Sequence, residues 1–191
     1  MVTYAQLINT TWGENTANII KVDKDTFINT IEKNYYFIER DFAEMATEYK
    51  QIVSYCLIVC ENDYFITQRT EKQTEKRLHN KYSLGIGGHI NQYDLKGENV
   101  IIAGMLRELF EEVNIQSAYS YSFQGIINDN STEVNAVHCG VCFLVALEKK
   151  ECFIRETEKM YGFWINKTDI GQYYDSLEGW SKILVNSLVE D

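Results

Sequence analysis

The spacing of apolar residues along the chain changes near residue 51. Before this point, "DKDTFINTIEKNYYFIER" and "DFAEMATEYK" carry apolar residues at intervals of three and four, which predicts helices. From residue 51, the run "QIVSYCLIVC", the turn "END" and the run "YFITQRT" predict a β-hairpin. We therefore expect a helical extension over residues 1–50, packed on a domain formed by residues 51–191.

After the hairpin, strand and helix patterns alternate. The polar, basic loop "EKQTEKRLHNKY" leads into a short glycine-containing strand, "SLGIGGHI", and then into a helix from Asn99 to Val113. Further strands are predicted in "YSYSFQGIIND", "EVNAVHCGVCFLVAL" and "CFIRETEKMYGFWI", and a helix from about residue 175 to 188. Helices at the start, middle and end of a series of strands predict one mixed α/β domain with helices on both faces of its sheet.

The predicted helix at 99–113 has an unusually acidic face. Glu108, Glu111 and Glu112 share one side with Arg107 at its edge, and the opposite side is apolar. Like charges three or four residues apart destabilise a helix by about a few tenths of a kcal/mol per pair. A hard divalent cation with oxygen ligands would offset that cost. For such a helix taken alone, a solvated acidic face is commoner than a metal site. The choice between the two therefore depends on the glycines upstream.

Those glycines complete a known pattern. "GGHI", then Glu98, then "RELFEEVNI" resembles the Nudix box of the Nudix hydrolases. Gly88 matches the opening glycine, the run from Arg107 to Glu112 matches the core of the box position for position, and Ile115 closes it. The resemblance implies a Nudix-like α/β/α sandwich with a mixed sheet.

The chain departs from the Nudix box at three points. Nine residues separate Gly88 from Glu98 where the box has five, and eight separate Glu98 from Arg107 where it has seven. The place of Glu98 in the site is therefore open. Asn114 replaces a glycine, and we expect it just after the helix in the left-handed backbone region, which asparagine tolerates.

The resemblance also implies a reaction. Nudix hydrolases typically cleave a diphosphate linkage in a nucleoside diphosphate derivative by attack of water on phosphorus, with Mg²⁺ or Mn²⁺ bound. By carry-over, Glu108, Glu111 and Glu112 would be the metal ligands, and the Gly88 carbonyl is a candidate to complete the coordination. Arg107 would orient a glutamate, and Glu108, Glu111 and Arg107 would form the catalytic core.

The general base and the phosphate contacts are less closely defined. Glu133, Glu156 and Glu158 are candidate bases outside the box, with Glu158 preferred, although a surface position is the commoner role for any one of them. Candidate substrate-binding residues are Arg69, Arg77, Lys81, His89 and Glu98. His89 could reach a substrate phosphate or only cap a loop, and we leave both open.

Two other patterns suggest alternative sites. "HCGVC" at 138–142 has the spacing of a zinc half-site, but residues three apart in a strand point to opposite faces, so we do not expect zinc there. Cys56 and Cys60 share a strand face and are predicted to lie in the core. Aromatic residues near the C-terminus could stack on a base, but core packing is commoner: Tyr161, Phe163, Trp164 and Trp180.

Composition limits the partners. A net charge of −10 argues against nucleic acid and anionic membranes, but not against a phosphorylated small molecule held through a divalent cation. Five cysteines without a regular framework, and a start without a signal sequence, predict a cytoplasmic protein. The resemblance allows a homodimer.

Two alternatives to hydrolysis stay open, a nucleotide sensor without catalysis and an enzyme like isopentenyl-diphosphate isomerase.

Overall fold

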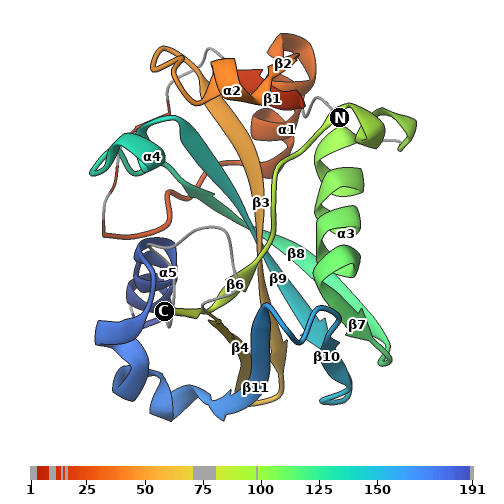
Figure 1. The fold of residues 1–191 in the computed structure, drawn as a ribbon, viewed down its shortest axis with the longest axis vertical. Coiled ribbons are helices and arrows are strands. Elements are labelled where there is room, and N and C mark those ends of the chain that lie inside the picture. The colour runs from red at the N-terminus through yellow and green to blue at the C-terminus, as the bar shows by residue number, and fades with distance from the viewer. Residues whose placement is uncertain are drawn as a thin grey trace.

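The fold is a mixed β-sheet with helices on both faces (Figure 1). The computed structural model describes residues 4–8, 12–13, 15, 17–70, 81–97 and 99–189. The strands are β1 (Tyr4–Ile8), β2 (Tyr36–Glu39), β3 (Lys50–Cys60), β4 (Asp63–Arg69), β5 (Tyr82–Ser83), β6 (Gly85–Ile86), β7 (Val113–Ile115), β8 (Tyr119–Ile127), β9 (His138–Leu147), β10 (Cys152–Ile154) and β11 (Met160–Asn166). The helices are α1 (Lys24–Asn34), α2 (Arg40–Ala43), η2 (Gln92–Lys96), α3 (Val100–Glu112), α4 (Glu133–Ala136), η3 (Lys167–Ser176) and α5 (Gly179–Val189), of which η2 and η3 are 3₁₀.

Strand β3 is the centre of the sheet. It pairs in parallel with β9, from Gln51 opposite His138 to Val59 opposite Ala146, and antiparallel with β4, β6 and β1. Among the other strands, β8 pairs with β9 and β11 pairs with β4. Strands β10 and β7 pair with each other in a separate small sheet. Residues 51–60 are buried without alternation, as expected for a strand covered on both faces.

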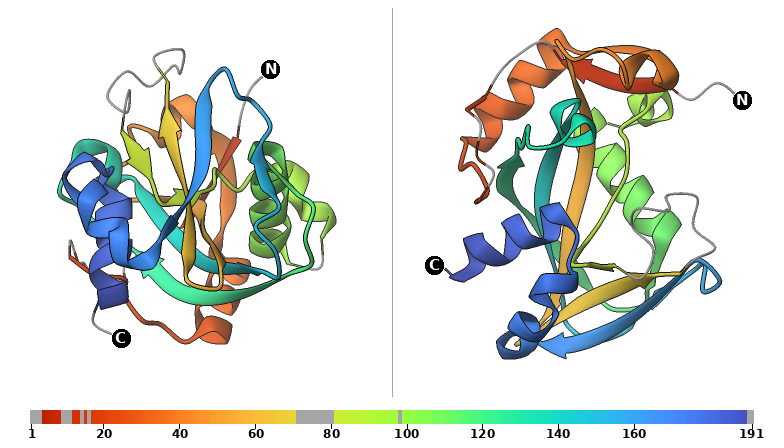
Figure 2. Two further views of the ribbon diagram at one scale, coloured as in Figure 1. Left: turned by 90° about the horizontal axis from the view of Figure 1, so that it is seen from below. Right: turned by 60° about the vertical axis from the view of Figure 1, so that its left-hand side comes forward.

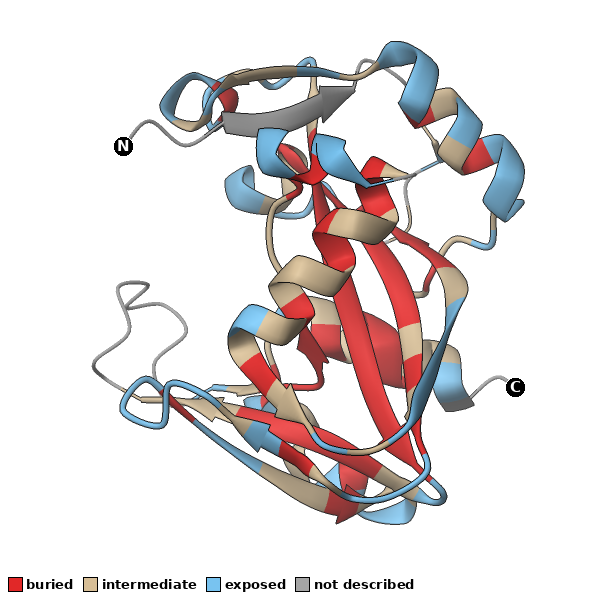
Figure 3. Cartoon of the chain, turned by 90° about the vertical axis from the view of Figure 1, so that its right-hand side faces the viewer, coloured by how far each residue is buried: buried red, intermediate tan, exposed pale blue. Residues whose placement is uncertain are grey.

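Alternate residues of β3 enter two different cores. Ile52, Cys56, Ile58 and Cys60 lie in the core beneath α3, whereas Tyr55, Leu57 and Val59 lie in the core beneath α5. Figure 3 shows this buried sheet, with α3, mostly buried or half-buried, packed along one side of it. Burying each large apolar side chain contributes about 1.5–3 kcal/mol. The predicted α/β fold with helices on both faces is confirmed. No helix in the described part of the chain is long and apolar enough to cross a bilayer.

The N-terminal region contributes strands as well as the predicted helices. Helix α1 begins at the N-cap Asp23, which accepts a hydrogen bond from the Thr26 N–H, and buries Phe27 and Ile31. The prediction of helix was wrong for β2, because β2 pairs with β1 and β1 pairs in turn with β3. These tertiary pairings outweigh the helical spacing of the sequence. The region lies at one end of the sheet (Figure 2).

Helix α3 is fixed at both ends. The N-cap Asn99 accepts a hydrogen bond from the Ile102 N–H at 3.0 Å, and the Arg155 Nε donates to the carbonyls of Phe110 (2.7 Å) and Val113 (3.1 Å). The expectation of a left-handed Asn114 was wrong, because this residue lies in β7 opposite Phe153. Arg155 thus satisfies the carbonyls of Phe110 and Val113 through its side chain and that of Glu112 through its N–H, and the chain continues directly into a strand.

Candidate active site

Gly88 lies against the carboxylate of Glu108. A Cβ added at residue 88 would be 2.2 Å from Oε2 of Glu108, so only glycine allows this approach. The Gly88 carbonyl accepts hydrogen bonds from the Ser54 N–H (2.9 Å) and hydroxyl (3.3 Å), which holds residue 88 beside β3. The carbonyl therefore already has partners within the sheet, and its role as a metal ligand stays a prediction.

Arg107 connects two of the three glutamates. Its Nη1 donates to Glu108 at 2.7 Å and to Glu111 at 3.2 Å, and its Nη2 donates to the carbonyl of His89 at 2.9 Å. Burial alone would lower the pKa of Arg107, but hydrogen bonds to Asp94 and Glu108 outweigh it and raise that pKa. A permanently charged guanidinium thus holds two carboxylates and the start of the loop in fixed positions.

The longer loop before the helix supplies a residue that the sequence analysis missed. Asp94, 4% exposed, binds Arg107 through both carboxylate oxygens, at 2.7 Å to Nε and 3.1 Å to Nη2. It also forms a capping box with Asn91 at the start of η2. The run "NQYD" carries the signal of that box, but not of the contact with Arg107. Glu98 lies outside the described residues, and the seven-residue spacing of the box falls on the N-cap Asn99.

The glutamates fit a divalent cation. Burial raises the pKa of Glu108, and the charge of Arg107 partly opposes this rise. Burial also raises the pKa of Glu112, where Arg69 partly opposes it. The side chain of Glu111 is 60% exposed. Three neighbouring carboxylates, one of them pressed against a glycine, supply oxygen donors of the kind that Mg²⁺ and Mn²⁺ use. Their ligand atoms do not converge on one point in this structure, in which Arg107 binds two of the three. The chemistry of these residues nevertheless fits such an ion.

Two adjoining pockets lie on the side of α3 that carries Glu112. The small pocket, about 40 Å³, is lined by Glu112, Arg69 and Met160. It shares Tyr55, Arg69 and Gly87 with the large pocket, about 530 Å³. The large pocket is also lined by Arg40, Glu44, His89, His138, Glu178 and Trp180. A ligand can thus extend from Glu112 past Arg69 into the large pocket.

Of the other candidate substrate-binding residues, some line the large pocket and others do not. His89 lines the large pocket, and its pKa is lowered well below its ordinary value, mainly by burial, so the ring is neutral. The backbone carbonyl of Lys81 accepts a hydrogen bond from the Arg69 N–H at 3.2 Å, and Lys81 lines neither pocket. Arg77 lies outside the described residues.

A hydroxyl network at the edge of the large pocket was also missed. The hydroxyl of Tyr55 donates to Glu178 at 2.8 Å and is hydrogen-bonded to Ser181 at 2.8 Å and to Ser83 at 3.3 Å. Burial raises the pKa of Tyr55 well above its ordinary value, which keeps its proton in place. No sequence pattern could indicate this network, because its members come from three distant segments. Trp180 packs edge-on to Tyr55, with ring centroids 5.5 Å apart.

The loop between β10 and β11 carries two of the candidate general bases. The Arg155 N–H donates to the carbonyl of Glu112 at 3.0 Å, so the loop begins beside the end of α3. Glu158 and Glu156 are both exposed, and the hydroxyl of Thr70 donates to the Glu158 carbonyl at 2.8 Å. Glu133, the remaining candidate, is exposed in α4 and lines neither pocket.

The cysteines and most of the other aromatic residues pack inside the protein, but the expectation of core packing was wrong for Tyr161. Cys139 lies in the core beneath α3 and Cys142 in the core beneath α5, so the predicted opposition of these side chains is confirmed. Cys56 and Cys60 lie together in the first core, as predicted. Trp164 packs on Phe65, with ring centroids 5.3 Å apart. Tyr161 is exposed, and Phe163 packs on Tyr82 and Tyr173.

Comparison with known proteins agrees with the motif. No family model matches the chain. The Bacillus subtilis protein YmaB is 34% identical over 167 residues, which cover 83% of this chain and 80% of YmaB. The crystal structure of Tm1382, assigned to the Nudix hydrolases, is 30% identical, covers 98% of both chains and has a TM-score of 0.83. The Nudix domain of Shewanella oneidensis NrtR, crystallised with ADP ribose, shares the fold at 15% identity, with 74% of this chain and 87% of that one covered and a TM-score of 0.57. The chain belongs to the Nudix hydrolase superfamily.

Proposed function

We propose that the chain hydrolyses a diphosphate linkage in a nucleoside diphosphate derivative, with Mg²⁺ or Mn²⁺ held by Glu108, Glu111 and Glu112. The observation that carries this proposal is the placement of Arg107 between two of these glutamates while the third lines the pocket. The bound ion would neutralise phosphate charge and lower the pKa of a coordinated water. The Gly88 carbonyl is retained as a candidate additional ligand.

The protein's own cations suit the phosphates of such a substrate. Arg69 lines both pockets and lowers the pKa of Glu112, so its charge lies near the carboxylate end of the site. Arg40 lines the large pocket but not the small one. A guanidinium can bind phosphate through two parallel hydrogen bonds, so these arginines would orient the diphosphate toward the glutamates.

The large pocket suits the remainder of a nucleotide. Its volume of about 530 Å³ lies within the range of small-molecule sites, about 300–1,000 Å³. Trp180 and Tyr55 supply aromatic surface, and Glu178 supplies an acceptor for a hydroxyl or amino group. Together these residues favour a ligand with a ring system and polar substituents over a simple inorganic diphosphate.

Glu158 is the proposed general base. Its loop starts beside Glu112 and is tied to the end of β4 through Thr70, next to Arg69. Glu156 is the alternative, because it raises the pKa of Glu112 and is thus close enough to interact with it. A carboxylate on this loop would accept the proton of the attacking water.

A substrate screen tests the proposal. Nucleoside diphosphate derivatives, including ADP ribose, are incubated with the folded protein and either Mg²⁺ or Mn²⁺, and phosphate-containing products are measured. We expect turnover that Glu112→Gln lowers about 100-fold or more and that Glu148→Gln, at an exposed glutamate, leaves unchanged. Equal activity in Glu112→Gln would overturn the metal assignment. Ligand-induced thermal stabilisation without any turnover would replace the hydrolase by a nucleotide sensor.

A further inference from the structure

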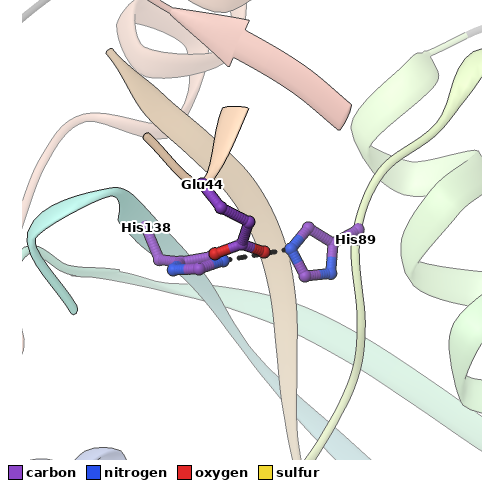
Figure 4. A group of neighbouring side chains, drawn as sticks. All are labelled: Glu44, His89 and His138. Atoms are coloured by element: carbon purple, nitrogen blue, oxygen red, sulfur yellow. Dashed lines mark hydrogen bonds between the residues drawn. The ribbon is translucent and has the colours of Figure 1, made fainter. Parts of the chain in front are cut away.

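Three potential metal ligands converge on the wall of the large pocket, outside the glutamate cluster of α3. Glu44 directly follows α2, His89 follows Gly88 on the segment beside β3, and His138 begins β9. One ligand atom of each lies within 4.8 Å of those of the other two, and Figure 4 shows the three side chains directed at one another. Segments that are far apart in the sequence thus bring two imidazoles and a carboxylate to one point.

The hydrogen bond of His138 to the main chain determines which ring nitrogen carries the proton. Its Nδ1 lies 2.6 Å from the carbonyl of Val134, which can only accept, so Nδ1 carries the proton. The lone pair of the ring is therefore on Nε2, and Nε2 faces His89. A histidine that donates its other N–H to a backbone carbonyl is the usual arrangement of a metal ligand.

The distance between the two rings fits a shared ion. Nε2 of His89 lies 3.1 Å from Nε2 of His138. Two nitrogens at that separation, each at the usual bond length of about 2.1 Å, would subtend an angle of about 95° at a metal ion. This angle suits two neighbouring ligands of one cation. A direct hydrogen bond between the rings is the competing explanation.

Glu44 can supply the third ligand. Its Oε1 is 3.3 Å from Nε of Arg40, and the two side chains are 39% and 41% exposed. An exposed pair of this kind contributes about 0.2–1 kcal/mol, so it does not prevent the carboxylate from binding a cation. The nearby positive charge of Arg40 opposes a cation, and the carboxylate partly compensates for it.

We propose that Glu44, His89 and His138 form a second metal site, which binds a transition-metal ion of the Zn²⁺ class. Two imidazoles and one carboxylate favour Zn²⁺, Co²⁺ or Ni²⁺ over Mg²⁺, which prefers oxygen ligands alone. Three protein ligands leave a coordination position open, and all three residues line the large pocket. The open position would bind an oxygen of water or of a pocket ligand. This site does not depend on the proposed hydrolysis.

Metal binding by the full chain tests the site directly. Protein stripped of metal is titrated with Co²⁺ and with Zn²⁺ in the presence of excess Mg²⁺, which occupies sites made of oxygen ligands. We expect one equivalent to bind, with visible Co²⁺ absorption bands and a Zn²⁺-dependent rise in Tm. His89→Gln and His138→Gln should each weaken Zn²⁺ binding about tenfold or more. Glu112→Gln and His79→Ala, at the one other histidine of the sequence, should leave it unchanged.

X-ray absorption of the Zn²⁺-loaded wild-type protein tests the site without any variant, so a misfolded variant cannot hide the answer. We expect two imidazoles in the coordination shell. A shell without imidazole, no binding in excess Mg²⁺, or undiminished binding in both folded histidine variants would each overturn the proposal. The last two results would leave the contact between the rings as a hydrogen bond.

Discussion

Arg107 binds Asp94 through two hydrogen bonds, with Nε 2.7 Å from Oδ1 and Nη2 3.1 Å from Oδ2. Asp94 lies in η2, within the loop that is longer than the Nudix box requires, and Arg107 lies on α3. Through Arg107 the pair also fixes Glu108 and Glu111. The extra loop residues therefore support the candidate metal site.

Asp94→Asn should weaken both stability and activity. Asparagine keeps an acceptor for the Asn91 N–H but leaves the charge of Arg107 without its most buried partner. Breaking a buried ion pair costs about 3–5 kcal/mol, and we expect the lower end because Arg107 is 22% exposed and keeps Glu108. Urea denaturation gives the free energy of unfolding, and kcat/KM for the substrate found in the screen should fall about tenfold or more. Asp175→Asn, at an exposed aspartate, is the control, and equal values in both variants would contradict the role of the pair.

The sequence was sufficient for the parts of the site that are local in the chain. Helical spacing and the box identified α3 and its glutamates, because all of them lie within one amphipathic segment. It was insufficient where distant segments meet. Nothing in "NQYD" indicates that Asp94 reaches Arg107, and nothing near Tyr55 indicates Glu178, which is 123 residues away.

The errors in secondary structure have the same origin. Residues of β2 have helical spacing but pair with β1, and Asn114 is drawn into β7 by β10 while Arg155 satisfies the end of α3. Each error arose where a contact from elsewhere in the chain outweighed a local preference.

Gly88→Ala should reduce metal binding. The added Cβ would lie 2.2 Å from Oε2 and 2.4 Å from Cδ of Glu108, so this carboxylate must move. We expect Mn²⁺ affinity, measured by isothermal titration, to fall about tenfold or more, because displaced ligand geometry weakens a metal site by that order. Gly171→Ala is a matched control, since a Cβ there meets no atom within 4 Å. Unchanged Mn²⁺ affinity in Gly88→Ala would show that Glu108 does not need its place against the glycine.

Glu158→Gln separates proton transfer from metal binding. Loss of a general base lowers kcat by about 10²–10⁴-fold, whereas an exposed residue that does not contact the ion leaves metal affinity unchanged. Glu156→Gln is measured beside it under the same conditions, because Glu156 lies on the same loop and pairs with Lys159. A large loss of kcat in Glu156→Gln alone would transfer the role to that residue, and no loss in either would exclude the loop as the source of the base.

The buried thiols should resist modification, and they should lower the free energy of unfolding at high pH. All five cysteines are buried with free thiols, and burial raises the pKa of Cys56 and of Cys139 from 9.0 to about 12. At pH 8 a thiol reagent should therefore label none of the five in the native protein and all five after denaturation. Rapid labelling of the native protein would contradict the observed burial.

The sign of the pH effect follows from which state keeps its protons. Above about pH 9 the unfolded chain loses the protons of Cys56 and Cys139, while the folded protein keeps them until about pH 12. The folded state then binds more protons, so the free energy of unfolding falls as pH rises through this window, by about 1.4 kcal/mol per pH unit for each such thiol. Cys56→Ala removes buried packing and should lower stability at pH 8, but it should also reduce this slope by the contribution of one thiol. Urea denaturation at pH 8 to 10.5 measures both, and an unchanged slope in Cys56→Ala would show that Cys56 ionises equally in the two states.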